Sequence, residues 1–412
     1  MEVVHERCAG LDVHKKTVVA CVLTAGPGVR ARPEVRTFET MAADLAALAA
    51  WLAERGVTHV ALESTGVYWW PLWNLLEGRF ALVLANARHV KAVPGRKTDV
   101  RDCEWLAQLL RHGLVRGSYV PDRAQRELRE LTRYRTALTR ERAAEINRLE
   151  KTLEGANVKL GAVATNPVGV SARAMLRALV EGATAPEALA ELARGRLRRK
   201  APELERALAG RVGPHQRFLL ARQLAHIDDL DELLAQVSAE IAARLRASEP
   251  ALARLEGIPG VGRRIAEILL AEVGPDPAAH FPDARRLASW AAMCPGNHQS
   301  AGKRMSGRTR RGCPWLRSAL VEAAQAAARS KDSYLGAQVR RLAARRGRKR
   351  AAVAVGHTIL TIAYYVLTRE REYQDLGLNY FDRRDHDRVT DQLVRRLERL
   401  GHHVSLKPAA AS

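Results

Sequence analysis

Four acidic residues within the first 102 positions have types and spacings that suit a metal ion. Asp12 lies in the apolar run GLDV, and Glu63 closes the apolar run HVALE. Asp99 and Asp102 are three residues apart just before the apolar ladder WLAQLL, so on a helix they would share one face. Carboxylates this close repel one another unless a divalent cation such as Mg²⁺ or Mn²⁺, which prefers oxygen ligands, lies between them. Such an ion serves phosphoryl transfer, because it orients a phosphate and offsets charge on the reacting oxygens.

A second group of reactive side chains lies in the segment GNHQSAGKRMSGRTRRG, residues 296–312. Its serines are Ser300 and Ser306. A serine hydroxyl is a weak nucleophile until a base or a metal assists it, and guanidinium groups around it would hold a phosphate in line. The basic residues of the segment are Lys303, Arg304, Arg308, Arg310 and Arg311. Taken alone, the segment also fits a solvated basic loop with incidental serines.

The stretch LEGIPGVGRRIAEILL, which begins at Leu255, has a Gly260-x-Gly262 turn between two apolar helical patterns. In a helix-hairpin-helix, such a turn exposes backbone N–H groups at a helix N-terminus, and these bind a phosphate without reading sequence. Arg263 and Arg264 follow directly. They favour phosphate binding over the alternative of a plain helix start.

The net charge indicates the kind of partner. The 412 residues carry a formal charge of +22 and a pI near 10.5, which attracts polyanions and most often nucleic acid. Residues 302–350 hold 15 lysines and arginines against two acidic residues, so the positive charge is concentrated there. The five cysteines are scattered without a CxxC pair, and the first residues show no signal-peptide pattern. We therefore expect free thiols in a cytoplasmic protein.

The elements that would position these groups differ along the chain. Residues 1–120 predict an α/β domain, because β-rich runs alternate with helical patterns. Two β-rich runs lie within residues 9–26, and the later elements are a helix at 41–56, a strand at 57–64, a helix or turn at 67–78 and a strand at 79–87. In open α/β sheets, functional groups gather at the carboxyl ends of strands, where Asp12 and Glu63 are expected.

The rest of the chain predicts helices. Residues 121–249 carry two apolar seams at steps of three and four residues, which indicate an antiparallel coiled-coil arm or, as the alternative, an ordinary helical bundle. Residues 250–375 predict a basic, mainly helical domain, and residues 376–412 form a tail without an assignable signal. The uncharged run 351–368 has the minimum length of a membrane span, but its composition and basic front edge favour a buried core helix.

These segments resemble the DEDD transposases of bacterial insertion-sequence family 110, whose N-terminal domain is similar to RuvC-type, RNase H-like nucleases. The resemblance rests on GLDVHKKTVVACVL, ALESTGVYWWPLWNLLE, KTDVRDCEWLAQLLRHGLV and the later positions Trp290, Pro295, Ser300, Gly302 and Lys303. It implies a metal-binding tetrad at Asp12, Glu63, Asp99 and Asp102. It also implies that Ser300 attacks DNA and forms a phosphoserine intermediate. Ser306 is the alternative nucleophile, because Ala301 stands where many members have glycine or serine.

The resemblance further implies a DNA transposase or recombinase that uses Mg²⁺ or Mn²⁺ and is guided by a structured bridge RNA. It implies a dimer or tetramer in the bacterial cytoplasm, associated with the nucleoid and not with a membrane. Two alternatives stay open. The chain could be a RuvC-like junction endonuclease that uses the carboxylates alone, or a non-catalytic nucleic-acid binder whose acidic residues cap helices.

Overall fold

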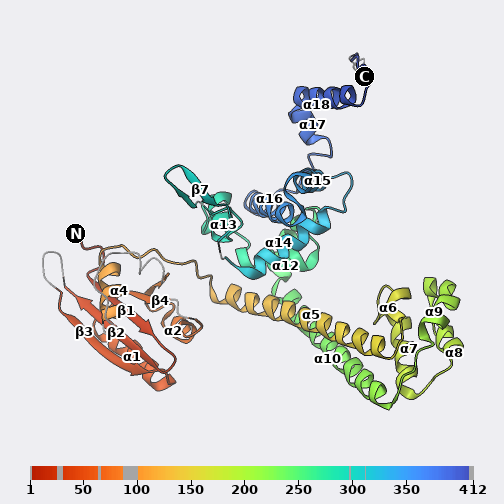
Figure 1. The fold of residues 1–412 in the computed structure, drawn as a ribbon. Helices are drawn as coiled ribbons and strands as arrows, with labels where there is room; N and C mark the ends of the chain where they lie inside the picture. The colour runs from red at the N-terminus through yellow and green to blue at the C-terminus, as the bar shows by residue number, and fades with distance from the viewer. Residues whose placement is uncertain are drawn as a thin grey trace. The chain divides into compact units, whose positions relative to one another are not determined.

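The chain folds into two compact units, residues 1–123 and 124–412 (Figure 1). The computed structural model describes residues 2–25, 31–63, 66–86, 101–296, 298–310 and 312–407. For Arg101, His298 and Arg304 it describes the backbone only. The two units are described separately below.

The first unit is built on a mixed five-stranded sheet with the order β3-β2-β1-β4-β5. The strands are β1 (Arg7–Val13), β2 (Thr17–Thr24), β3 (Pro33–Glu39), β4 (His59–Glu63) and β5 (Ala81–Ala85). β1, β2 and β3 pair antiparallel, whereas β1, β4 and β5 are parallel. This order confirms the predicted α/β domain and is compatible with the RNase H-like fold. β3 was not expected, because its sequence PEVRTFE is rich in charged residues and lies half exposed at the sheet edge.

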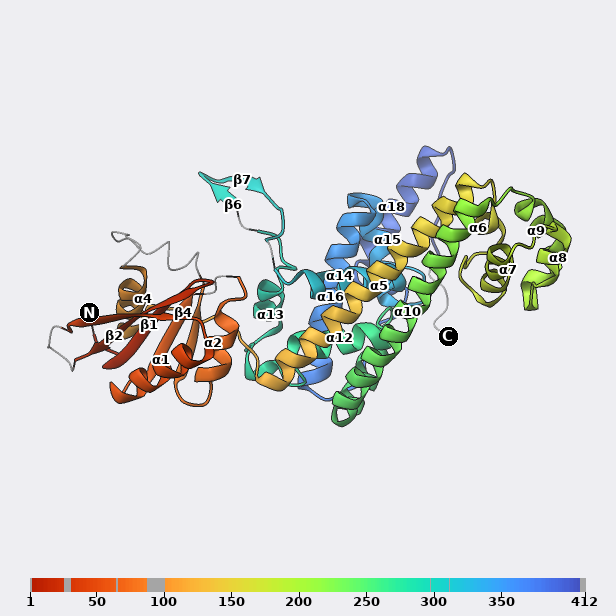
Figure 2. The same cartoon turned by 90° about the horizontal axis from the view of Figure 1, so that it is seen from below.

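Helices cover both faces of this sheet (Figure 2). The helices are α1 (Ala42–Glu54), α2 (Trp69–Leu76) and α4 (Arg101–Arg111). Leu11 and Leu62 belong to the core that α1 and α2 cover, whereas Cys8 and Ala61 belong to the core beneath α4. Alternate residues of β1 therefore point to opposite cores, as the pleat of a strand requires.

Two long helices form an arm in the second unit, where they lie side by side and antiparallel (Figures 1 and 2). They are α5 (Arg123–Gly155) and α10 (Pro214–Arg244). Leu138 of α5 packs against Leu230 and Leu234 of α10, and near the other end of the pair Arg244 bonds Glu127 at 2.8 Å. The two predicted long helices are thus present, while their supercoiling stays a prediction.

A helical head closes the far end of the arm. Its elements are α6 (Leu160–Val163), α7 (Val170–Glu181), α8 (Pro186–Glu191), the 3₁₀ helix η1 (Gly195–Lys200) and α9 (Ala201–Leu208). These short helices share one apolar core with the adjacent ends of α5 and α10, including the fully buried Leu149, Met175 and Leu220. The head is therefore an ordered extension of the arm.

The central helix of the next group is α16 (Arg348–Thr368), which contains the uncharged run. It packs against α11 (Glu249–Glu256), α13 (Ala284–Trp290), α14 (Pro314–Ala327) and α15 (Tyr334–Arg346), whereas α12 (Arg263–Val273) packs against α11 and α14. Within the described residues, α16 is the one helix long and apolar enough to cross a membrane, and 56% of its apolar window is buried. Val355, Ile359 and Ala363 are at most 2% exposed, as the predicted core helix requires.

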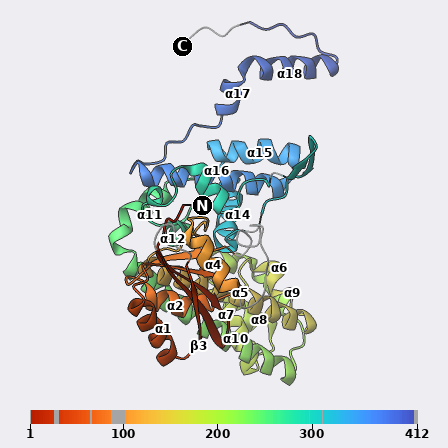
Figure 3. The ribbon, with the colours of Figure 1, turned by 90° about the vertical axis from the view of Figure 1, so that its left-hand side faces the viewer.

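The tail contains two helices that the sequence did not indicate, α17 (Tyr380–Arg384) and α18 (His386–Arg399), which follow α16 in Figure 3. Tyr380 and Phe381 of α17 contact the ring of Tyr334, with centroids 5.0 and 5.3 Å away. α18 buries none of its residues.

Candidate functional site

Asp12 and Glu63 lie side by side at the carboxyl ends of two adjacent parallel strands. Leu11 of β1 is the register partner of Leu62 of β4, and Asp12 and Glu63 are the next residue on each strand. Partners in a parallel pair point to the same face, so the two carboxylates share one side of the sheet. Asp12 is two residues after Gly10 and therefore lies on the face covered by α4.

Gly10 lets α4 lie directly on β1. A Cβ built on Gly10 would be 2.3 Å from the carbonyl oxygen of Cys103 and 2.5 Å from the backbone nitrogen of Ala107. Only glycine allows so close an approach of two backbones. Asp102, one residue before Cys103, is consequently held near the Asp12 end of β1.

The direction of α4 brings its N-terminus to the acidic end of the sheet. Its last residue, Arg111, accepts backbone hydrogen bonds from Val4 at 2.9 Å and His5 at 3.1 Å, just before β1 begins. The helix therefore runs opposite to β1, and its first turn, which contains Asp102, lies at the carboxyl end of the strand. The positive end of the helix dipole favours carboxylates at this place.

Asp12 is the most enclosed of these acids. Its side chain is 12% exposed, and the His14 ring nitrogen Nε2 lies 3.1 Å from its Oδ2. Burial raises the pKa of the Cys103 thiol to about 11, and the nearby charge of Asp12 adds to that rise. His14 stands two residues after Asp12 in the motif GLDVHK, a spacing that does not by itself predict a contact with the carboxylate.

Three of the four predicted metal ligands, Asp12, Glu63 and Asp102, therefore lie toward the same edge of the sheet. Asp99 lies outside the described residues. Among the residues that are described, no three His, Cys, Asp or Glu side chains are already close enough to share one ion. The donor set is nevertheless made of carboxylates, the ligand type that Mg²⁺ and Mn²⁺ prefer. The residues present therefore fit a hard divalent cation.

The predicted serine segment forms a β-hairpin of β6 (His298–Ser300) and β7 (Lys303–Ser306). Ser300 and Lys303 pair across a two-residue turn, in which Ala301 and Gly302 have φ of +47° and +74°. Such turns normally need glycine or asparagine at positive φ, so Ala301 is strained. Ser300 is therefore the last strand residue before a strained turn.

A hollow of about 480 Å³ lies against this hairpin. Its lining residues are Gln299, Ser300, Met305, Ser306, Arg308, Thr309 and Arg310. The two candidate serines and two of the predicted basic residues therefore share one surface. Lys303, which pairs with Ser300 from β7, is exposed. Arg311 and the side chain of Arg304 lie outside the described part of the chain.

The two serines differ in what their hydroxyls do. Ser306 Oγ accepts the backbone N–H of Arg308 at 3.1 Å and so shapes the turn that leaves β7. Ser300 is exposed, and its hydroxyl makes no hydrogen bond to any residue that the structure describes. Arg310 reaches from the hollow to the hydroxyl of Ser289 at 2.7 Å.

The Gly260-x-Gly262 turn joins α11 to α12, and its two glycines have different roles. A Cβ on Gly260 would lie 2.2 Å from the carbonyl oxygen of Ala323, so this glycine allows the turn to lie on α14. Gly262 is the exposed N-cap residue directly before α12, and a Cβ there would meet nothing within 4 Å. Only Gly262 therefore presents open backbone to a ligand.

The two arginines after this turn also differ. Arg263 contacts three carboxylates, those of Glu249 at 2.6 Å, Glu256 at 3.4 Å and Glu267 at 3.1 Å. The bond to Glu249 raises the pKa of Arg263 above its usual value. Arg264 is exposed. Of this pair, Arg264 is the side chain available to a phosphate.

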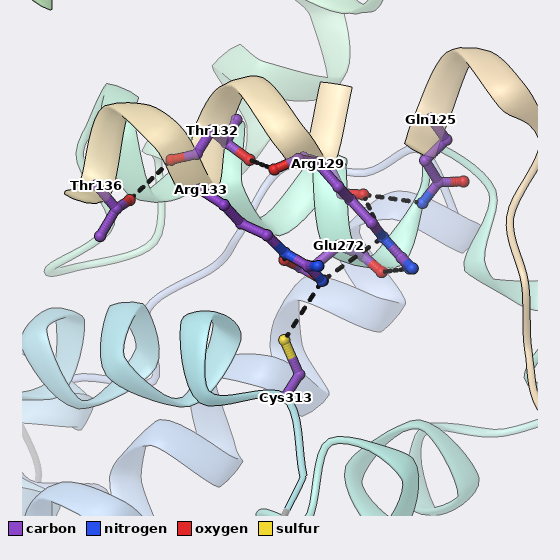
Figure 4. A network of polar contacts seen from close by, with 8 residues as sticks. Gln125, Arg129, Thr132, Arg133, Thr136, Glu272 and Cys313 are labelled. Atoms are coloured by element: carbon purple, nitrogen blue, oxygen red, sulfur yellow. Dashed lines mark hydrogen bonds and ion pairs between the residues drawn. The ribbon is translucent and has the colours of Figure 1, made fainter. Parts of the chain in front are cut away.

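A buried ion network joins α12 to the arm helix α5 (Figure 4). The side chain of Glu272 on α12 is 1% exposed and accepts two hydrogen bonds from Arg133 of α5, at 2.7 and 2.9 Å. Arg129 donates to the carbonyl oxygen of Ala271 at 3.0 Å, and Cys313 Sγ lies 4.0 Å from Arg133 Nη2. No local sequence pattern predicts these contacts, because the ion-pair partners are 139 residues apart.

Comparison with known proteins finds transposases over both units. Residues 9–158 match the DEDD family model described as "Transposase", and residues 252–340 match that of the "Transposase IS116/IS110/IS902 family". A probable family 20 transposase of Pseudomonas aeruginosa is 25% identical over 323 residues, which cover 76% of this chain and 85% of the relative. The transposase for insertion sequence element IS1111A of Coxiella burnetii is 26% identical over 296 residues, covering 71% and 72%.

Proposed function

Because the chain belongs to the DEDD transposases of the IS110 family, a family of DNA-cutting and DNA-rejoining enzymes, we propose that it moves an insertion sequence by a two-step transesterification. In the first step Ser300 attacks a DNA phosphodiester. In the second step a hydroxyl group of the partner strand displaces the serine. The phosphoester bond is kept throughout, so no nucleotide hydrolysis is needed.

The arrangement that supports the proposal is that Asp12 and Glu63 end two adjacent parallel strands, while the first turn of α4, which contains Asp102, lies toward the same edge of the sheet. Together with Asp99 they would hold a Mg²⁺ or Mn²⁺ ion. Such an ion, when bound, orients the scissile phosphate and offsets the charge on the reacting oxygens. The contact from His14 restricts the orientation of the Asp12 carboxylate.

Ser300 is favoured over Ser306 as the nucleophile by its exposure and by the engagement of the Ser306 oxygen with Arg308. As the Ser300 Oγ–phosphorus bond forms, the bond from phosphorus to the leaving DNA oxygen breaks. Arg308, which lines the same hollow as Ser300, and Lys303, the cross-strand partner of Ser300, would hold the phosphate, because guanidinium and ammonium groups bind its oxygens.

The partners in this proposal are donor DNA, target DNA and a structured guide RNA. The charge of +22 supports more than one polyanion. The proposal also requires the carboxylates and Ser300 to act on one phosphodiester although they belong to different units of the chain. Assembly into a dimer or tetramer on the nucleic acids would supply that arrangement.

The deciding experiment traps covalent DNA on the purified protein, using DNA and RNA from the regions that flank its gene. We expect the parent and Ser306→Ala to form an adduct whose DNA maps to Ser300, and Ser300→Ala to form none. If Ser300→Ala still cleaves DNA and no adduct appears in the parent, the carboxylates act alone as in a junction endonuclease.

A second test separates a metal enzyme from a nucleic-acid binder. Asp12→Asn and Asp102→Asn should reduce Mg²⁺-dependent cleavage by about 100-fold or more, because a charged group at the reacting phosphate is lost. DNA binding should remain, since it depends on the basic residues. Cleavage at the parent rate in both variants would contradict the carboxylate assignment.

A further inference from the structure

The head of the arm carries a basic cluster that the proposed chemistry does not use. It consists of Arg194, Arg196, Arg198, Arg199 and Lys200, all exposed and all within seven residues of the sequence RGRLRRK. This segment contains no acidic residue. Four of these residues belong to the 3₁₀ helix η1, and the fifth directly precedes it.

The cluster is held in a fixed position. Ala193, just before it, is 4% exposed in the head core, and Leu197, in its middle, packs against that core. The backbone N–H of Arg194 donates to Ser171 Oγ of α7 at 2.9 Å. The charges are therefore carried by an anchored helix, so a ligand would bind them without first ordering a loop.

The arginines of the cluster lack the acidic partners that other arginines of the head have. Arg173 pairs with Asp228 and with Asp231, and Arg177 pairs with Asp228 at 3.1 Å. In the cluster, by contrast, the one ion pair within the described residues joins Lys200 to Glu203 at 3.9 Å. Arg173 and Arg177 are thus neutralised by carboxylates, whereas the arginines of the cluster face solvent without an acidic partner among the described residues.

The geometry of η1 holds these positive charges close together, so that they repel one another. A 3₁₀ helix has three residues per turn and rises about 2 Å per residue, so Arg196 and Arg199 share one side and the cluster spans about 12 Å. That span is close to the Debye length in physiological salt, so the charges act together. A polyanion laid along them removes the repulsion.

We propose that this cluster is a second nucleic-acid contact, which binds the phosphate backbone at the head of the arm. Arginine supplies four of its five cations, and its planar fork matches phosphate oxygens. The apolar residue of the cluster, Leu197, is committed to the core, so no apolar face is left for a membrane. α5, at 33 residues, is about 50 Å long, so the contact lies well away from the serine hairpin within the same unit.

The test compares two variants of the full chain with equal loss of charge. Arg196→Gln/Arg199→Gln removes two cluster arginines from one side of η1. Arg148→Gln/Arg177→Gln, the control, removes two arginines that are 62% and 61% exposed but already paired with acids. Binding to a 30-base-pair DNA duplex and to a 30-base-pair RNA hairpin is measured from 0.05 to 1 M salt in EDTA, which excludes cleavage. The result is thus independent of the role of Ser300.

The affinity falls as salt rises, and we expect this salt dependence to be weaker in the cluster variant. The slope of log affinity against log salt should be less negative by about 1.8, at 0.9 per lost phosphate contact. The cluster variant would bind about 60-fold more weakly at 0.1 M salt and equally at 1 M. The nucleic acid whose salt dependence weakens, DNA, RNA or both, is the ligand. An unchanged slope on both, or an equal change in the control, would overturn the proposal. Polyglutamate serves as a third probe. If the cluster variant loses binding to polyglutamate and keeps binding to both nucleic acids, the partner is an acidic protein and the proposal is wrong. Equal melting temperatures show that both variants are folded.

Discussion

Gly10 of β1 and Cys103 of α4 are in backbone contact, since a Cβ on Gly10 would lie 2.3 Å from the Cys103 carbonyl oxygen. This contact sets the height of α4 above the sheet, and with it the separation of Asp102 from Asp12. Gly10 therefore helps to position the carboxylates of Asp12 and Asp102, although it has no side chain of its own.

Gly10→Ala should displace α4 and destabilise the first unit by about 1–3 kcal/mol, the usual cost of forcing an extra carbon into a packed core. Mg²⁺-dependent cleavage should fall further than stability explains, because Asp102 moves away from Asp12. Urea unfolding and cleavage rate are the measurements. Gly155→Ala is the control, since a Cβ at Gly155 meets nothing within 4 Å. Parent-like cleavage in Gly10→Ala would show that this contact does not position the acids.

The thiol of Cys103 predicts a pH dependence of stability. Burial raises its pKa from 9.0 to about 11 in the folded chain. Between these values the unfolded chain releases the proton and the folded chain keeps it, so the contribution to stability is present below pH 9 and is lost as the pH rises to about 11. Urea midpoints from pH 8 to 11 should therefore fall more steeply in the parent than in Cys103→Ala. Parallel curves would count against a buried thiol at this position.

Glu272→Ala should strongly destabilise the second unit, because it leaves Arg133 and the 11%-exposed Arg129 without their carboxylate. Removal of one partner of a buried ion pair costs about 3–5 kcal/mol. At 2–4 °C per kcal/mol for a domain of this size, the melting temperature should fall by about 10 °C. Glu232→Ala, an exposed change on α10, should leave it within about 1 °C. An equal effect of the two changes would mean that the network contributes little.

Two substitutions in the turn after Ser300 should have opposite effects on the stability of the hairpin. Ala301→Gly should relax the hairpin by about 1 kcal/mol, because alanine is strained at positive φ. Gly302→Ala should destabilise it by a similar amount, although a Cβ there meets nothing. The rate of limited proteolysis within residues 298–306 should fall in the first variant and rise in the second, with unchanged melting temperatures. Changes of the same sign would contradict a strained two-residue turn.

Local patterns in the sequence predicted much of the first unit. Apolar strands and the helix ending at Gly56 carry strong periodic signals, and the rule that functional groups lie at strand ends brought Asp12 and Glu63 together. β3 could not be predicted, because PEVRTFE forms a half-exposed edge strand. At such an edge, burial does not require apolar and polar residues to alternate. Gly10 read as an ordinary strand residue, since its role depends on a helix about 95 residues later in the chain.

The second unit was less predictable for a different reason. The seams of α5 and α10 revealed two long helices, but the ion pairs from Arg133 to Glu272 join distant residues that carry no local pattern. The sequence of the serine hairpin fits a basic loop, because Ala301 occupies a turn position where asparagine or glycine would have been informative. The roles of Gly260 and Gly262 look equal in the sequence and differ only through contact with α14.

The segment that carries Ser300 is tethered at both of its ends and at its base. Cys294 Sγ lies 3.8 Å from His357 Nδ1 of α16, Cys313 lies against Arg133, and Pro295 and Thr309 form a β-bridge. We therefore expect replacements at the turn residues Ala301 and Gly302 to leave the helices on either side undisturbed. The tip of the hairpin can thus change in sequence while the helices that present Ser300 stay in place.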